Sequence, residues 1–131
     1  MISLANNWHP ENPGISGSLP SEIMGLSSLN AMFLQANGIT GSLPVDFGRL
    51  SSLKTFVAVR NRLTGRIPSS LALIPDLGTF IAAYNFLTGT IPSELGLIKT
   101  GINRTLLISK CPSSFSPRSA VHSVGFWVGF W

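Results

Sequence analysis

GSLP at residues Gly17–Pro20 decides how this sequence folds, because the chain returns to the same tetrapeptide pattern three more times. The later copies are GSLP at Gly41–Pro44, GRIP at Gly65–Pro68 and GTIP at Gly89–Pro92, so the glycines recur at a constant step of 24. Apolar residues keep the same step at three further positions of each copy. They stand two before the glycine (Ile15, Ile39, Leu63, Leu87) and three and six after the proline (Ile23, Phe47, Leu71, Leu95 and Leu26, Leu50, Ile74, Ile98). Chance does not hold that many columns in register, so the period predicts a repeat architecture.

One copy, residues 29–37 (LNAMFLQAN), predicts the local structure of the others. Met32 and Leu34 are expected on one side of a short strand and their neighbours on the other, which is the two-residue period of a β-strand. The same pair recurs as Phe56 with Ala58 and as Phe80 with Ala82. Each copy is therefore expected to contribute one short strand with two inward side chains.

Asparagine precedes the glycine by four positions in three copies, as Asn37, Asn61 and Asn85. An asparagine amide can bond main-chain groups of its own turn and of the neighbouring turn. Stacked copies would therefore align these amides into a ladder that satisfies backbone groups buried at the bend. The glycine then permits a close approach of backbones, and the proline blocks a continuing strand, which favours a short helical or 3₁₀ return leg.

A single copy has too few inward side chains for a core of its own, so the copies must stack with parallel strands about 4.8 Å apart. The columns closely resemble the plant-type leucine-rich repeat, L-x-x-L-x-L-x-x-N-x-L-x-G-x-I-P-x-x-L-G-x-L, over Leu29–Ser52, Leu53–Asp76 and Leu77–Thr100. Ala58 and Ala82 depart from that pattern by replacing a large strand residue. The resemblance implies an α/β repeat solenoid, a right-handed curved coil with short parallel strands on its concave face and 3₁₀ or irregular return legs.

Three segments are expected along the chain. Residues 1–11 form a degenerate N-terminal remnant, in which Trp8 stands one period before Met32 and could fill the same core column. Residues 12–100 hold about four repeats. Residues 101–131 begin as a partial repeat with Leu106 in the strand column and continue as an irregular tail. We expect the chain to be a piece of a longer protein, or to end at 109–131 in a segment that is not genuine protein; a short protein with an anchoring tail is the alternative.

Composition and charge exclude several classes of protein. Charged residues make up 11% of the chain, against about 25% in ordinary globular proteins, which argues against a charged disordered tail or a coiled coil. The net charge of +4 resides in residues 99–131, where four basic side chains meet no acid. Sparse basic residues without interleaved aromatics argue against a nucleic-acid partner. No apolar run reaches the about 18 residues of a membrane span, although a parent protein could carry one.

The sequence offers few candidate catalytic residues. His9 and His122 lie far apart outside the repeats, and neither has a nucleophile or metal-binding motif beside it. The single cysteine, Cys111, makes a cysteine-rich metal site improbable. We therefore expect a protein that is not an enzyme and that has no metal and no cofactor.

Binding is the better-supported function, because outward strand positions of a stacked solenoid form one contiguous concave face. Phe33, Val57 and Ile81 share one column of that face, Gln35, Val59 and Ala83 the next, and Ala36, Arg60 and Tyr84 the last. An apolar lane beside Arg60 and Tyr84 is typical of a protein or peptide contact surface. The alternative is that these residues merely stabilise strands through cross-strand pairs. Arg62 and Arg66 fall past the turn and favour an ordinary solvated edge.

The resemblance implies a non-catalytic module that recognises a protein or peptide, as in ectodomains of receptor-like kinases, receptor-like proteins and secreted inhibitors of cell-wall enzymes; similar repeats occur in algal and diatom proteins. It also implies an extracellular or cell-surface location. A purely structural segment of a longer array, or an ectodomain piece of a kinase whose catalytic domain is absent here, stays open. Asn103 begins an Asn-Arg-Thr triplet that would accept a glycan in a secreted protein, although such triplets are also frequent by chance.

Overall fold

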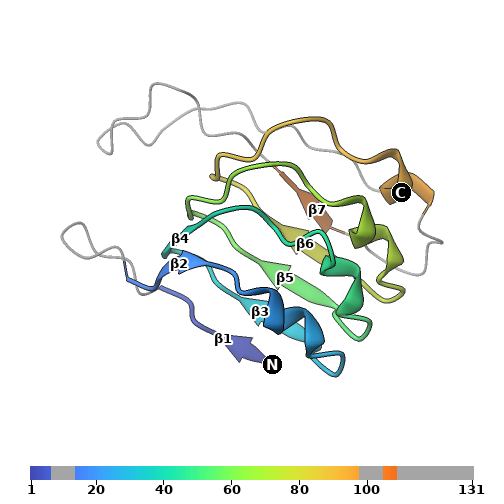
Figure 1. The fold of residues 1–131 in the computed structure, drawn as a ribbon, viewed down its shortest axis with the longest axis horizontal. Coiled ribbons are helices and arrows are strands. Elements are labelled where there is room, and N and C mark those ends of the chain that lie inside the picture. Colours follow the sequence, from blue (N-terminus) through green and yellow to red (C-terminus); the bar gives the residue numbers. More distant parts are fainter. Residues whose placement is uncertain (7–13, 98–104, 109–131) are drawn as a thin grey trace.

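The computed structural model describes residues 1–6, 14–97 and 105–108, which form a coil of stacked turns (Figure 1). Its main sheet has five parallel strands in the order β1-β3-β5-β6-β7. These strands are β1 (Ile2–Ser3), β3 (Ala31–Phe33), β5 (Thr55–Val57), β6 (Thr79–Ile81) and β7 (Thr105–Leu107). Met32 pairs with Phe56 and Phe56 with Phe80, so the period of the sequence is also the register of this sheet.

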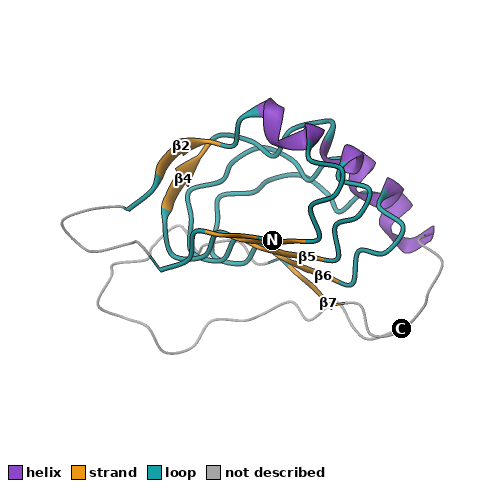
Figure 2. Cartoon of the chain, turned by 90° about the horizontal axis from the view of Figure 1, so that it is seen from below, coloured by secondary structure: helices purple, strands orange, loops and turns teal. Residues whose placement is uncertain are grey.

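Return legs of 3₁₀ helix close each turn on the side opposite the main sheet, as the proline in each copy predicts. They are η1 (Ser21–Gly25), η2 (Phe47–Arg49), η3 (Ser69–Leu73) and η4 (Ser93–Leu97). Pro20 and Pro68 directly precede η1 and η3 with extended backbone, and neither has an N–H with which to continue a strand ladder. Figure 2, seen from below, shows the resulting turns one behind another, with the main sheet along one edge and the 3₁₀ segments along another.

A second parallel sheet, absent from the sequence-based expectation, joins β2 (Ser16–Ser18) to β4 (Gly38–Thr40) on the third side of the coil (Figure 2). Here Gly17 pairs with Ile39, whereas in the repeat pattern the equivalent of Gly17 is Gly41. The bridge between Ser42 and Thr64 keeps the same offset. Successive copies are therefore displaced along this side, by an amount that the period alone did not predict.

Glycines with positive φ mark the corner between this second sheet and the proline. The φ angles of Gly41, Gly65 and Gly89 are +76°, +74° and +81°. A Cβ at Gly41 would lie 2.9 Å from the Cβ of Ser18, and one at Gly65 would lie 3.0 Å from the Cβ of Ser42. Both the backbone conformation and the close approach of the preceding copy therefore require glycine here.

The core fills the space between the three sides and is richest in the middle copies. Phe56 stacks on Phe80 with ring centroids 5.1 Å apart, and Phe47 from η2 meets the Phe56 ring edge-on at 5.1 Å. Ala58 and Ala82, the departures from the repeat pattern, are fully buried in the same core. Where the earlier copy uses Met32 with Leu34, the later copies use a large phenylalanine with a small alanine, so the ring offsets part of the volume that the alanine leaves.

The outermost strands of the main sheet are β1 and β7. Leu106 of β7 pairs with Phe80, which confirms the strand predicted in the partial repeat. Ile2, and not Trp8, pairs with Met32; Trp8 itself lies outside the described residues. The first turn of the coil is therefore longer than the period, because Ile2, which pairs with Met32, precedes Trp8 in the chain.

The first return leg also differs from its expected packing. Leu26 is 46% exposed, whereas its equivalent Leu50 is fully buried. Met24 is buried instead, at a position that the later copies give to the smaller Gly48 and Ala72. The long Met24 side chain enters the core of the first copy. The repeat pattern did not predict this, because the equivalent residues in the later copies are small.

Candidate ligand-binding surface

Buried asparagine amides fix the bend that follows each strand of the main sheet. Asn61 accepts a hydrogen bond from the backbone N–H of Ile39 through Oδ1 at 3.1 Å. Its Nδ2 donates to the carbonyl of Leu34 at 2.8 Å and to that of Ala58 at 3.3 Å. Asn37 and Asn85 make the equivalent hydrogen bonds in the copies before and after. These hydrogen bonds are the ladder expected from the sequence, and they hold each bend against the preceding copy.

The outward side of the main sheet, called the strand face below, corresponds to the expected concave face. The register places Phe33 beside Val57 and Val57 beside Ile81, so these three side chains form a partly buried apolar lane across neighbouring strands. Gln35 and Val59, also partly buried, follow in the next column. The structure therefore brings together side chains that lie one period apart in sequence, as the spacing predicted.

Ala36, Arg60 and Tyr84 end the strand face in a left-handed backbone conformation, with φ of 53°, 56° and 55°. Non-glycine residues adopt this region at a cost, and here the asparagine that follows each one is held by the ladder. Arg60 and Tyr84 are exposed at the bend, whereas Ala36 is partly buried. The Arg60 guanidinium lies 5.8 Å from the centre of the Tyr84 ring, within the range of a cation–π contact.

Two residues of the predicted face behave differently from a simple outward position. Ala83 is 2% exposed, so it offers little of the contact surface expected of it. An alanine methyl extends too little beyond the backbone to stay accessible between larger neighbours. The Oε1 atom of Gln35 is buried and accepts no hydrogen bond within the described part of the chain. An unsatisfied amide oxygen carries a desolvation cost that an incoming donor could relieve.

Charged side chains are sorted between the sides of the coil. Among the described residues, the carboxylates belong to the 3₁₀ segments and the turns beside them. They are Glu22, Asp46, Asp76 and Glu94. Arg49 lies at the same side, 4.0 Å from Asp46. Arg60, Arg62 and Arg66 instead follow the strand and the bend, so these arginines and the carboxylates occupy different faces.

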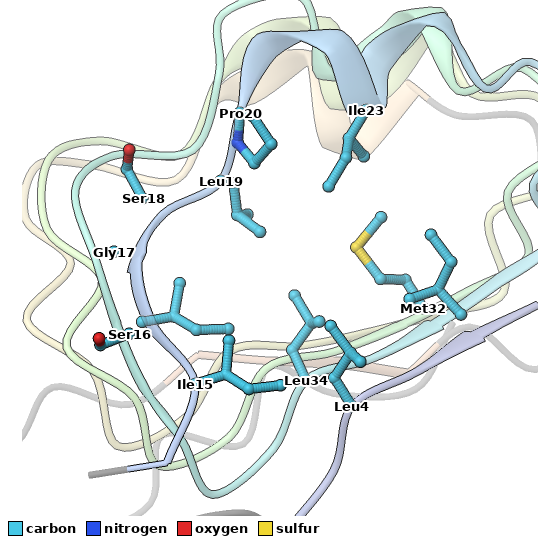
Figure 3. Close-up of a pocket in the computed structure, with 12 residues that line it drawn as sticks. Leu4, Ile15, Ser16, Gly17, Ser18, Leu19, Pro20, Ile23, Met32 and Leu34 are labelled. Atoms are coloured by element: carbon cyan, nitrogen blue, oxygen red, sulfur yellow. The ribbon is translucent and has the colours of Figure 1, made fainter.

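The first copy leaves an apolar cavity of about 100 Å³ open at the β1 edge. Figure 3 shows Leu4, Ile15, Leu19, Ile23, Met32 and Leu34 directed into this space, while Ser16 and Ser18 point away from it. These apolar walls are the inward side chains of the first described turns. The cavity therefore belongs to the solenoid core beside β1, and its lining offers few polar groups to a ligand.

Four residues that the sequence analysis named are not described by the structure. His9, Asn103, Cys111 and His122 lie outside the described residues. Within residues 1–6, 14–97 and 105–108, no group of three His, Cys, Asp or Glu side chains could hold a metal ion. Those same residues include no helix that is long and apolar enough to cross a membrane.

The chain is similar to known proteins at the level of solved structures. No protein-family model matches it, and neither does any curated protein. Solved structures do match. A BIR3–SERK2 complex from Arabidopsis thaliana is 38% identical with a TM-score of 0.60, over 63% of this chain and 44% of that one. The plant peptide hormone receptor RGFR1 in complex with RGF2 is 35% identical with a TM-score of 0.64, over 72% and 14% of the two chains.

A third match, a plant ice-binding protein, is 32% identical with a TM-score of 0.62, over 72% of this chain and 30% of that one. The chain thus spans less than half the length of each solved protein described here. Together with the regular register, the asparagine ladder and the 3₁₀ return legs, these likenesses define a leucine-rich-repeat solenoid. In fold and in repeat pattern the chain is similar to the plant-type leucine-rich-repeat proteins, and these matches support that family.

Proposed function

We propose that this chain is a non-catalytic recognition module, a segment of a longer extracellular or cell-surface protein, that binds a protein or peptide on its strand face. The observation that supports the proposal is the arrangement at the bend. The apolar lane of Phe33, Val57 and Ile81 runs beside Arg60 and Tyr84, whose exposed side chains are positioned by a left-handed backbone and by their mutual contact. An apolar lane can be desolvated on binding, while arginine and tyrosine supply directed hydrogen bonds at its edge.

Similar solved proteins favour a binding function over a purely structural one. The solved RGFR1 is a peptide hormone receptor in complex with RGF2, and HAESA was solved with the peptide hormone IDA and the co-receptor SERK1. The likeness to a plant ice-binding protein indicates that this fold serves other functions as well. The proposal therefore depends on the side chains of this chain's own strand face.

A peptide selection on the intact chain tests the proposal. Peptides enriched from a random displayed library would be titrated against the wild type, Arg60→Ala and Tyr84→Ala. We expect each substitution to weaken binding about tenfold, because both residues are exposed and are typical energetic anchors. Selected peptides that bind all three proteins equally would place the contact elsewhere, and a library without enrichment would favour the purely structural alternative.

Ser69→Ala is the matched control, because Ser69 is exposed on η3 at the opposite side of the coil. Its neighbour Ser70 is unsuitable, since the Ser70 hydroxyl donates to the Val45 carbonyl at 2.6 Å and accepts from the Gly48 N–H at 3.2 Å. The Ser70 hydroxyl therefore links two copies through hydrogen bonds, and its removal could alter the structure. Ser69→Ala should leave peptide affinity within about twofold of wild type.

A further inference from the structure

The second sheet continues beyond β4 into a surface that the strand face does not include. The N–H of Arg62 donates to the Ile39 carbonyl, that of Thr64 to Gly41, and that of Thr88 to Gly65, each at 2.7–2.8 Å. Exposed side chains alternate here with buried ones, so their outward positions form one surface, called the lateral face below. Backbone hydrogen bonds between copies make this surface a fixed platform rather than a set of separate loops.

Hydroxyl groups dominate the lateral face, and two arginines and one phenylalanine stand among them. The hydroxyl residues are Ser18, Thr40, Ser42, Thr64, Thr88 and Thr90, all of them exposed or partly so. Arg62 and Arg66 are exposed in the same strand-like segment, and Phe86 of the next copy is 54% exposed. No carboxylate of the described residues lies on this face, because all of them belong to the 3₁₀ side.

The neighbouring copy positions the side chain of Arg66. The Arg66 Cγ, Cδ and Nε lie 2.9, 3.2 and 3.3 Å from the place where a Cβ of Gly89 would stand. The stem of Arg66, as far as its Nε, therefore lies against the bare backbone of Gly89 in the next copy. An arginine anchored in this way loses less side-chain entropy when it binds an anion than a free one does.

We propose that the lateral face binds a linear polysaccharide that carries carboxylates, such as a polyuronate. Guanidinium groups bind carboxylates through paired N–H donors, and the exposed Arg62 and Arg66 stand on either side of the Gly65 corner of one copy. Serine and threonine hydroxyls donate and accept, which matches the ring hydroxyls of a sugar. Phe86 offers an exposed aromatic face on which the C–H side of a sugar ring can stack.

An acidic peptide is the less suitable occupant of this face. It would supply carboxylates to the arginines but few partners for the hydroxyl groups. Added as a strand, it would need unpaired backbone groups, and the N–H groups of Arg62, Thr64 and Thr88 already bond the preceding copy. The lateral face is also separate from the strand face, so this proposal does not depend on the peptide site described above.

The test titrates the full chain with polygalacturonate of defined length, with its methyl ester and with polyglutamate of equal charge. We expect polygalacturonate to bind with an affinity that falls as salt is raised, and the uncharged methyl ester to bind at least about tenfold more weakly. Polyglutamate should also bind at least about tenfold more weakly than polygalacturonate. Equal binding of polyglutamate would overturn the proposal, because the face would then recognise charge alone.

Variants locate the site. Arg62→Ala with Arg66→Ala should weaken polygalacturonate binding at least about tenfold. The matched control, Arg49→Ala with Lys54→Ala, removes the same charge from η2 and the turn after it and should weaken binding less than about twofold. Arg62→Lys with Arg66→Lys keeps the charge but loses paired N–H donation, so it should bind several-fold more weakly than wild type. Equal losses in the two alanine pairs would overturn the proposal.

Phe86→Ala tests the aromatic contribution without a change of charge. It should weaken polygalacturonate binding about threefold or more while leaving the salt dependence unchanged. The control is Leu73→Ala, an exposed apolar residue on η3, which should have no effect. Circular dichroism of every variant establishes that it is folded, and an unaltered affinity in folded Phe86→Ala would contradict the proposed stacking.

Discussion

The middle copies of the solenoid and its first copy use the same sequence columns with different results. Leu63 is fully buried, while Ile15, at the equivalent position of the first copy, is 36% exposed. Leu50 and Leu26 differ in the same direction. In this architecture the copies on either side bury a side chain, and on one side of the first full copy the structure describes only residues 1–6. Burial therefore depends on position in the stack as much as on the residue.

The largest difference in the free energy of unfolding is expected between alanine substitutions at two equivalent positions, Leu63 and Ile15. Leu63→Ala should lower the free energy of unfolding by about 2–5 kcal/mol, because it leaves a cavity among side chains that cannot collapse. Ile15→Ala should cost about 1 kcal/mol or less, because its side chain is already partly in water. Denaturant unfolding of both variants measures the difference. Equal losses would mean that Ile15 is covered in solution by something other than a neighbouring copy.

Loss of one ladder amide should have the next largest effect. Asn61→Ala should cost about 1–3 kcal/mol, because the Ile39 N–H and the Leu34 carbonyl lose a buried partner. The exposed neighbour provides a control, since Arg62→Ala should change the free energy of unfolding by less than about 0.5 kcal/mol. A loss below a few tenths for Asn61→Ala, measured by denaturant unfolding, would contradict the structural role of the ladder.

Alanine substitutions at two glycines with positive φ can distinguish the cost of backbone strain from the cost of contact between copies. Gly17 and Gly65 both have positive φ, but an added Cβ meets nothing within 4 Å at Gly17 and meets Ser42 at 3.0 Å at Gly65. Gly65→Ala should therefore destabilise the protein by about 1 kcal/mol more than Gly17→Ala. The excess should disappear in a Ser42→Gly background, measured as a double-mutant cycle. An excess that persists there would assign it to the backbone.

The smallest effect on stability is expected at the exposed edge, where the consequence is association instead. Leu26→Ser should change the free energy of unfolding by about 0.5 kcal/mol or less. It should also shift the chain toward monomer in sedimentation velocity, because the apolar edge of the first copy can be covered by another molecule. A wild-type chain that is already monomeric, with a sharp unfolding transition at high temperature, would contradict this view of the open end.

Most of the solenoid could be predicted from the sequence, because its columns repeat at a fixed step. The register of Met32, Phe56 and Phe80, the strand at Leu106, the asparagine ladder and the 3₁₀ return legs all follow from that step. The lane of Phe33, Val57 and Ile81 follows in the same way, although its role in binding stays a prediction. These features depend on residues within one copy and on their equivalents, which a period makes visible.

What only the tertiary structure decided is how each copy meets the next. The period could not give the pairing of Gly17 with Ile39 on the second sheet, the first strand at Ile2, or the burial of Met24 in place of Leu26. It also could not show that Ala83 is covered, that Arg60 lies over Tyr84, or that Arg66 lies on Gly89. A sequence column fixes which residues are equivalent, because spacing along the chain is covalent. Contacts between copies depend on side-chain volume, glycine corners and the presence of a neighbour, and these act only once the coil is stacked.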